Sequence, residues 1–355
     1  MRGDFLNLKV EYNKVIEFVS ACLKYGNSKQ QQINWNTDDI VNDSASDLLD
    51  FAPNPDVKAW LNQVDEEISP FLRNDIVFVM VRVPSVDDFC FKLVLDYNLE
   101  NIEDFFEALE KSDENDLVKM IFRGYNTDIP FDSDDKLIKD TLLKIYNKDV
   151  ASLFMQIKNH PSEFKSRMIQ SMKDFYLHFY KPHQQIAYEF MIEKVNEHNK
   201  IISENAVYFI NTIGLGDYTK LLKKQKNIRI FVSYFYDLGM FHVGLDNIFV
   251  LFYGQSSDQR FNGQLSMDKL KAFFKALSDE TRLEIIRVTS KKAWYQKELA
   301  DYLGLTTPTL SYHVNLLLEV GILSFEPSSN NRYYYTTNKG KLEQLLDFSK
   351  KEMLN

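Results

Sequence analysis

The hydrophobic and polar positions of the N-terminal part of the chain indicate both strands and helices. Leu6–Tyr12 alternates with period two and predicts a short strand, and Val15–Tyr25 has the period of a helix that we expect to end at Gly26. The stretch Ser28–Ser46 is rich in Gln, Asn, Asp and Ser and predicts a loop with a helix starting near its end. Ile76–Val83 is a continuous apolar run rich in β-branched residues, which predicts a strand buried on both faces.

Helical periodicity dominates the middle of the chain. Three long helices are predicted: Asp135–Asn159, Pro161–Tyr180 and His183–Asn205. Two apolar runs then predict strands, Ile228–Tyr236 and Asn247–Tyr253. Gly, Ser, Gln and Asn cluster in Gly254–Ser266, which is typical of a linker between domains.

A new helical pattern begins after this linker. Its apolar positions follow helical spacing: Leu270, Phe273, Phe274 and Leu277. Ser278 is the expected N-cap of the next helix, because Asp279 and Glu280 in the first turn would complement the helix dipole. That helix is predicted to present three apolar side chains to a core: Leu283, Ile285 and Ile286.

The segment that follows has the pattern of a helix-turn-helix. A short helix is predicted from about Tyr295 to Leu303, and Gly304 stands where a left-handed residue would end it. Thr306 is the expected N-cap of a second helix, Thr307–Glu319, with a proline tolerated in its first turn. A helix, a tight turn containing Gly and a second capped helix together indicate this motif.

The second helix has one apolar and one polar side. Leu310, Val314 and Leu317 form a stripe that is predicted to face the domain core. The other side carries hydroxyl, phenol, imidazole and amide groups, which suit phosphate and base-edge contacts in a major groove. With one arginine of the next hairpin, the predicted DNA contacts are Thr307, Thr309, Ser311, Tyr312, His313, Asn315 and Arg332. A solvated helix face is the alternative interpretation.

A hairpin and a final helix complete the pattern. Ile322–Glu326 and Arg332–Thr337 predict two strands whose connecting turn contains Ser and Asn, and Arg332 at its end can reach a phosphate. The last helix is predicted over Lys339–Leu354. It aligns four apolar residues that could pack against a second subunit: Leu342, Leu345, Leu346 and Met353.

These patterns together predict an α+β, predominantly helical fold. A large mixed α/β N-terminal domain, residues 1–262, precedes a C-terminal winged helix-turn-helix domain, residues 263–355. The charges are divided in the same way: residues 267–355 hold 13 basic and 11 acidic side chains, within a chain of net charge -9. An acidic domain therefore carries a smaller, slightly basic one.

Residues 270–337 resemble the ArsR-type winged helix-turn-helix family of bacterial transcription regulators. The resemblance rests on FFKALSDETRLEII (273–286), ELADYLGLTTPTLSYHVNLLLEVGIL (298–323) and RYYYTT (332–337), and it covers roughly a quarter of the chain. It implies a homodimer that places two recognition helices in successive major grooves of an operator. By position, the seven predicted DNA contacts correspond to the family's DNA-facing segment and wing.

One departure from the family concerns metals. Many members sense metals through cysteines at the start of the helix before the turn, where this chain has Trp294–Leu299. The predicted DNA-binding domain has no cysteine, and its one histidine is His313. We therefore predict no metal site and no sensing of soft metals.

Cofactor and catalytic motifs are not evident in the large domain. Gly214 and Gly216 lack the third glycine of a dinucleotide fingerprint, and neither a phosphate loop nor a nucleophile elbow occurs. The acidic run Asp132–Asp135 is interpreted as a solvated helix start rather than a calcium site. Dense aromatics at Phe175–Tyr180 and Phe231–Phe241 fit either core packing or an apolar ligand pocket. We expect no cofactor, no catalytic residue and no enzymatic activity.

The remaining features concern location. Two cysteines, Cys22 and Cys90, cannot form a disulfide framework. No secretory signal is visible, and no apolar run has the length of a membrane helix. We expect a cytoplasmic protein without a membrane partner.

The sequence predicts a sequence-specific DNA-binding regulator, a repressor, with double-stranded operator DNA and a second copy of the chain as partners. The N-terminal domain is predicted to bind a small non-metal effector, at residues the sequence does not define, or to stabilise the dimer. Two other classes stay open. One is a cofactor-independent enzyme with a DNA-binding appendage. The other is a winged-helix module that binds proteins, because strong DNA binders are usually more basic.

Overall fold

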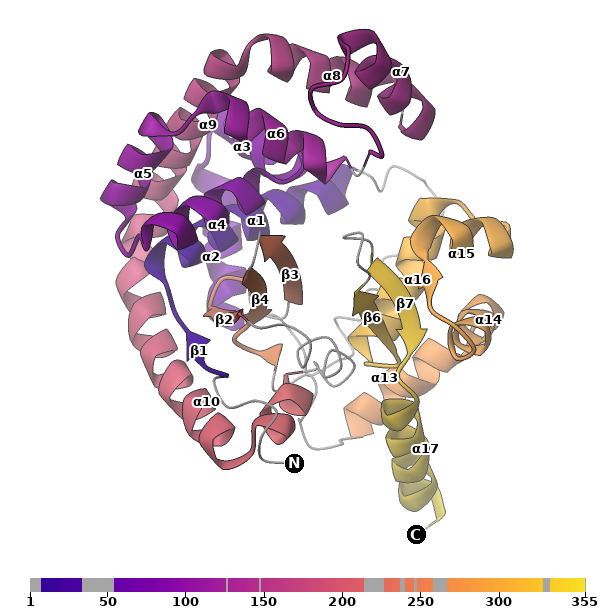
Figure 1. The fold of residues 1–355 in the computed structure, drawn as a ribbon. Coiled ribbons are helices and arrows are strands. Elements are labelled where there is room, and N and C mark those ends of the chain that lie inside the picture. Colours follow the sequence, from indigo (N-terminus) through magenta and orange to yellow (C-terminus); the bar gives the residue numbers. More distant parts are fainter. Residues whose placement is uncertain are drawn as a thin grey trace.

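The computed structural model has two hydrophobic cores, an N-terminal body and a C-terminal body. Figure 1 shows the helices and strands of both. The structure describes residues 8–33, 54–125, 127–146, 148–213, 227–236, 240–245, 248–257, 267–327 and 333–354. Buried hydrophobic residues between Val10 and Tyr253 form one core, and those between Leu270 and Leu345 form the other. The predicted boundary between residues 262 and 263 lies outside the described residues and stays a prediction.

Helices make up most of the N-terminal body, as the sequence predicts. They are α1 (Lys14–Ile33), α2 (Pro55–Glu67), α3 (Pro70–Val77), α4 (Val86–Tyr97), α5 (Ile102–Lys111), α6 (Glu114–Gly124), α7 (Asp135–Ile145), α8 (Lys148–Asn159), α9 (Pro161–Phe175) and α10 (Gln184–Thr212). Six of them begin after a residue whose side chain accepts a backbone N–H: Asn13, Asn54, Ser69, Asn101, Asp113 and Asp134. The acidic run before α7 is therefore a helix start, as predicted.

A four-stranded sheet completes the N-terminal body. Its strands are β1 (Val10–Glu11), β2 (Ile228–Ser233), β3 (Met240–Leu245) and β4 (Ile248–Gly254), in the order β1-β2-β4-β3. β1, β2 and β4 are parallel, with Ile230 opposite Leu251, and β3 is antiparallel to β4. β2 and β4 confirm the two strands predicted near the end of this domain.

Consecutive residues of β4 face opposite layers of helices. Phe252 stacks on Phe91 of α4, with ring centroids 4.5 Å apart. The next residue, Tyr253, meets His198 of α10, where its hydroxyl lies 2.5 Å from Nδ1. Because side chains alternate along a strand, a strand covered on both faces must be apolar throughout, and this explains the uninterrupted run in β4.

Ile76–Val83 is helical, so the strand predicted there is wrong. The segment contains the end of α3 and a turn of wider, π-type helix, Phe78–Arg82. Ile76, Val79, Met80 and Val83 are buried, whereas Arg82 is exposed. The buried positions are spaced i, i+3, i+4 and i+7, which is a helical face. Short apolar runs do not separate a buried strand from a buried helix, and Ser69 and Pro70 supply the helix start.

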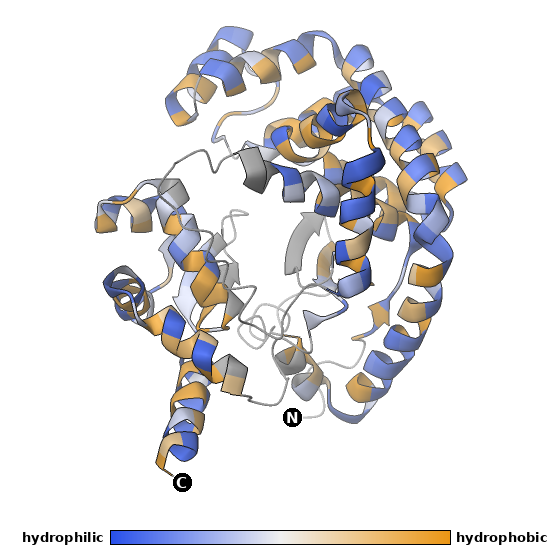
Figure 2. Ribbon diagram, turned by 180° about the vertical axis from the view of Figure 1, so that it is seen from behind, coloured by the Kyte–Doolittle hydropathy of each residue, from blue (hydrophilic) through white to orange (hydrophobic). Residues whose placement is uncertain are grey.

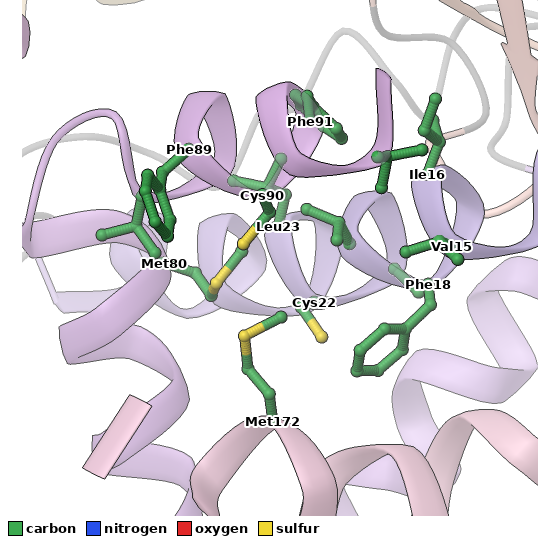
Figure 3. Packing of buried hydrophobic residues seen from close by; sticks show 14 of the residues in the cluster. Val15, Ile16, Phe18, Cys22, Leu23, Met80, Phe89, Cys90, Phe91 and Met172 are labelled. Atoms are coloured by element: carbon green, nitrogen blue, oxygen red, sulfur yellow. The ribbon is translucent and has the colours of Figure 1, made fainter. Parts of the chain in front are cut away.

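The first helix continues beyond Gly26, where the sequence predicted its end. α1 runs to Ile33, so residues 28–33 are helical and not part of a loop, while 34–46 lie outside the described residues. A Cβ at Gly26 would lie 2.7 Å from Cγ2 of Val81. The glycine therefore permits close packing of α1 against the π-type turn. Figure 3 shows the same helix directing Cys22 toward Met172 of α9.

The other predicted helices are confirmed, with internal breaks. The segment 135–159 contains α7 and α8, and 161–180 contains α9 followed by a π-type turn, Tyr176–Tyr180. α10 starts one residue after a 3-10 turn, Lys181–His183, and continues to Thr212 with non-helical backbone at Asn205. The predicted first strand is reduced to β1, residues 10–11.

The C-terminal body contains five helices and a three-stranded antiparallel sheet within its described residues (Figure 1). The helices are α13 (Met267–Leu277), α14 (Glu280–Thr289), α15 (Gln296–Leu303), α16 (Thr307–Glu319) and α17 (Lys339–Leu354). The strands are β5 (Trp294–Tyr295), β6 (Leu323–Pro327) and β7 (Tyr333–Thr337), in the order β5-β7-β6. This is the winged helix-turn-helix arrangement that the sequence predicts.

A buried carboxylate joins the first helix to the end of β2. Glu17 is 1% exposed, and it accepts hydrogen bonds from Ser233 Oγ and from the backbone N–H groups of Tyr234 and Phe235. Burial raises the pKa of Glu17 to about 7, although these three donors act to lower it. The side chain therefore fixes the turn after β2 and titrates near neutral pH.

We expect Glu17→Gln to change how the stability of the protein depends on pH. The folded-state pKa of about 7 lies above the ordinary value of 4.5, so the contribution of this group is complete below pH 4.5 and is lost as the pH rises through 7. Between pH 5 and 8 the free energy of unfolding of the wild type should fall by roughly 2–3 kcal/mol more than that of Glu17→Gln. Urea unfolding followed by circular dichroism measures this. Glu193→Gln, at an exposed site in α10, is the control, and parallel slopes for wild type and Glu17→Gln would contradict the expectation.

Candidate nucleic-acid interface

Local signals set the turn between α15 and α16. Gly304 has φ +67°, and no atom lies within 4 Å of the position of a Cβ there, so the backbone conformation alone favours glycine. Leu305 N–H donates to the carbonyl of Ala300, which closes the end of α15. Thr306 then caps α16 by accepting the N–H of Thr309. Both predicted caps are confirmed, and α16 has the predicted bounds.

The apolar side of α16 is buried as predicted. Leu310, Val314 and Leu317 have no exposed surface. They belong to the C-terminal core with Ile285 of α14 and Ile322 before β6. Their burial fixes the rotation of the helix about its axis, and Asn315, on the opposite side, is exposed.

The structure distributes the predicted contact residues over several environments. Asn315 is exposed, and Thr309 and Tyr312 are half-buried. Ser311 is half-buried too, and its Oγ accepts a hydrogen bond from Gln296 Nε2 at 2.7 Å. The side chain of Thr307 and all of Arg332 lie outside the described residues. No DNA is present in the structure, so the contacts themselves stay predictions.

Gln296 is a residue that the sequence analysis missed. It is the first residue of α15, and its hydrogen bond to Ser311 joins the two helices of the motif. Its neighbour Lys297 is exposed. Proximity to α16 depends on how the two helices cross, so no local pattern identifies Gln296. Its place at the start of the first helix of the motif is the only signal in the sequence.

The side chain of His313 packs beside Asp279, at the start of α14. This side chain is 13% exposed, and Nδ1 lies 3.5 Å from Asp279 Oδ1. Burial lowers the pKa of His313, the carboxylate of Asp279 opposes this shift, and the guanidinium of Arg282 adds to it. The imidazole is thus less accessible to a ligand than the amide of Asn315.

The start of α14 differs in detail from the prediction. Asp279, rather than Ser278, is the N-cap, because its side chain accepts the N–H of Arg282, whereas the Ser278 hydroxyl donates to the carbonyl of Lys275. Leu283 is 49% exposed and does not face the core, because only one side of this short helix can be covered. Ile285 is buried as predicted.

The wing is attached to α14 by buried hydroxyl groups. Phe325 of β6 pairs with Tyr335 of β7, as expected for the predicted hairpin. Thr337 Oγ1 donates to the carbonyl of Ile286 at 3.0 Å and lies 2.7 Å from Thr289 Oγ1. These bonds hold the base of the hairpin, while its tip, residues 328–332, lies outside the described residues.

The last helix has the predicted bounds, but some of its apolar residues are buried in the domain core and others are exposed. Leu345 is buried in the core of its own domain, and Leu342 is partly buried against it. Leu346, Met353 and Leu354 are exposed, and apolar residues recur to the end of α17 (Figure 2). α13, which contacts α17, also has two exposed apolar side chains, Met267 and Phe274.

The two cysteines of the N-terminal body, Cys22 and Cys90, are both buried. Burial raises the pKa of both thiols, so neither has the exposure of a reactive cysteine. Within the described ranges, no group of three or more His, Cys, Asp or Glu residues is arranged to hold a metal ion. The aromatics at 175–180 that the sequence left between core and pocket include four buried residues: Phe175, Tyr176, Phe179 and Tyr180.

Comparison with known protein families gives a match to part of the chain. A family model described as a helix-turn-helix domain matches residues 277–324, which include α14, α15, the turn and α16. Neither the curated proteins nor the solved structures contain a match to the chain. The C-terminal part therefore carries a helix-turn-helix domain, which indicates a DNA-binding regulator, and the match does not extend to the N-terminal body.

None of the helices described here is both long and apolar enough to cross a membrane.

We expect Leu310→Ala to destabilise the C-terminal domain by about 2–5 kcal/mol, because truncating a fully buried leucine removes apolar packing and leaves a cavity. Denaturant unfolding followed by tryptophan fluorescence and by circular dichroism measures the change. Leu283→Ala makes the same chemical change at an exposed site of the same domain and should alter stability by less than about 0.5 kcal/mol. Equal effects of the two substitutions would contradict the observed rotation of α16.

Proposed function

We propose that the protein is a homodimeric, sequence-specific transcriptional repressor whose N-terminal domain binds a small non-metal effector or stabilises the dimer. The single observation that carries this proposal is the geometry of α16. Its apolar stripe is fully buried while Asn315 is exposed and Thr309 and Tyr312 are partly exposed, on a helix whose start is defined by Gly304 and Thr306. Such a helix can place polar side chains against base edges.

Nearby groups support binding to a polyanion. Lys297 is exposed in the first turn of α15, and Gln296 beside it bonds to the recognition helix. Lys291 and Lys292 are exposed between α14 and β5. Exposed cations in the same domain as the recognition helix would supply the kind of phosphate contacts that position a protein on DNA.

The proposal of a homodimer is supported by the apolar residues on α13 and α17. Five are exposed: Met267, Phe274, Leu346, Met353 and Leu354. Covering apolar surface on neighbouring helices stabilises association, and a two-fold dimer would present two recognition helices to two half-sites.

Effector control would act through the relative placement of the two recognition helices. An effector changes DNA affinity only by binding the DNA-competent and the incompetent forms with different affinity. Repression, the effector and the absence of enzymatic activity are parts of this proposal. The described N-terminal body has carboxyl groups with a raised pKa at Asp87, Asp88 and Glu17, and of these Glu17 is buried and accepts three hydrogen bonds from its own domain. We therefore assign it a structural role.

The test of the proposed function is binding to DNA. Fragments enriched by selection from random duplexes would be measured by fluorescence anisotropy with scrambled competitor, over a series of salt concentrations, because affinity for DNA depends strongly on salt. Binding that resists competitor supports the regulator. Failure of the selection to enrich any sequence would favour the alternative of a winged helix that binds another protein.

We expect Asn315→Ala and Tyr312→Ala each to weaken specific DNA binding by about 1–3 kcal/mol for each base-edge interaction that the substitution removes. Both variants should keep the wild-type circular dichroism spectrum, because neither residue lies on the buried stripe. Lys144→Ala in α7 is a control far along the chain from the motif. Unchanged affinity of both variants for the selected operator would contradict the assignment of this side of α16.

We expect the double variant Leu346→Glu, Met353→Glu to be monomeric where the wild type is dimeric, because charges at an apolar contact must be desolvated. Analytical ultracentrifugation measures the mass. Leu137→Glu, at a similarly exposed leucine of α7, should leave the mass unchanged. A double variant that sediments like the wild type would place the dimer contact elsewhere.

A further inference from the structure

One histidine of the recognition helix has an environment unlike that of a ligand-contacting residue. The His313 side chain is mostly buried, and Nδ1 lies 3.5 Å from Asp279 Oδ1. Within the described part of the chain, this nitrogen makes no hydrogen bond. Such a nitrogen is sensitive to protonation, because a charge placed on a mostly buried imidazole loses hydration that one carboxylate 3.5 Å away does not replace.

The carboxylate beside His313 already has a structural role. Asp279 Oδ1 accepts the N–H of Arg282 at 2.9 Å and so caps α14. The guanidinium of Arg282 donates from Nε to the carbonyl of Ala276 and from Nη2 to that of Lys275, both in the last turn of α13. Asp279, Arg282 and His313 therefore form one cluster, the α13–α14–α16 junction, which joins three helices.

We propose that His313 is a positioning residue whose neutral imidazole packs at the α13–α14–α16 junction and holds the recognition helix in place. Protonation of this imidazole displaces the helix and weakens DNA binding. The proposal rests on the proposed function and adds proton-dependent control of the same site. It replaces, for this residue, the direct DNA contact that the sequence predicts.

The charges around the imidazole determine the sign of the effect. Asp279 favours the protonated form, and Arg282 disfavours it. The charged residues of α15 (Lys297, Glu298 and Asp301) are exposed to solvent. Burial outweighs Asp279, so the pKa of His313 is lowered from its ordinary value of 6.5. The stability that this group contributes is present above pH 6.5 and is lost as the pH falls through the lowered folded-state pKa.

A direct contact with DNA would have the opposite sign. An imidazolium beside a phosphate strengthens binding, so acid would tighten a complex in which His313 touched the backbone. Acid weakens the complex when the proton instead displaces the helix. The direction of the pH dependence therefore separates the two roles of the residue.

The experiment measures DNA affinity of the full chain at pH 7.5 and 5.5 at constant ionic strength. One linked proton changes an equilibrium constant by at most tenfold per pH unit, so we expect the Kd of the wild type to rise about three- to tenfold more than that of His313→Gln. His178→Gln removes an exposed histidine of the N-terminal body and should behave like the wild type. Acid-strengthened binding that is lost in His313→Gln, or equal pH dependence in all three proteins, would overturn the proposal.

A second variant tests the contact with Asp279. Asp279→Asn keeps an oxygen that can cap α14 but removes the charge that favours imidazolium. The loss of affinity should therefore move to lower pH in this variant. An unchanged midpoint would show that the carboxylate does not act on His313 and would overturn the proposed junction.

A measurement without DNA separates this inference from the proposed function. In an NMR titration of imidazole resonances, the signal absent from His313→Gln identifies this residue in the full chain. We expect its pKa below 6.5, and a wild-type melting temperature that falls more in acid than that of His313→Gln. If the protein binds no DNA, the proposed function fails, but this titration still tests whether His313 packs at the α13–α14–α16 junction in its neutral form. A pKa at or above 6.5 would overturn the inference.

Discussion

Burial of the stripe Leu310, Val314 and Leu317 is the constraint on which the DNA-binding domain depends. Each side chain is fully buried, and such burial contributes about 1.5–3 kcal/mol per residue relative to exposure. That contribution exceeds what a single solvent-exposed hydrogen bond supplies. The apolar side therefore determines how α16 is rotated, and the polar residues between Leu310 and Leu317 are presented as a consequence. Asn315 is exposed because it lies on the side of the helix away from this stripe.

Polar side chains at the edges of both cores form hydrogen bonds that connect separate elements of the fold. Glu17 holds the turn after β2, and Thr337 holds the wing against α14. Arg282 holds the end of α13 in the same way. Glu17 and Arg282 bond to backbone groups at the ends of regular elements, whereas Thr337 adds a bond to a carbonyl that already accepts the N–H of Ser290. Such groups restrict the relative movement of elements more than apolar contacts do, since hydrogen bonds tolerate little change in geometry.

The sequence predicted the C-terminal domain better than the N-terminal one, for a physical reason. Gly304 acts through its own backbone and Thr306 through a hydrogen bond to the N–H three residues further on, so their roles can be derived from a few adjacent residues. The helix at Ile76–Val83 and the continuation of α1 through Gly26 depend on packing against distant elements. A continuous apolar run is compatible with either secondary structure until those neighbours are known.

The same distinction applies within the candidate interface. The buried stripe and the exposed Asn315 followed from helical periodicity. The pairing of Gln296 with Ser311 and the seat of His313 beside Asp279 did not, because they depend on how α15 and α14 cross the recognition helix. Periodicity gives the side of a helix on which a residue lies, but the partner on that side belongs to the tertiary structure.

The parallel pairing of β1 with β2 has a consequence for synthesis of the chain. Val10 is paired with Ile230, so the sheet joins the beginning of the N-terminal domain to its end. On the ribosome, β1 must wait until β2 and β4 have emerged before the sheet can be completed, and contacts between such distant residues form slowly. The winged helix, whose helices and hairpin pair with near neighbours in sequence, needs no such wait. The domain that is made last therefore has the shorter path to its folded form, and the large domain is the one exposed to chaperones while incomplete.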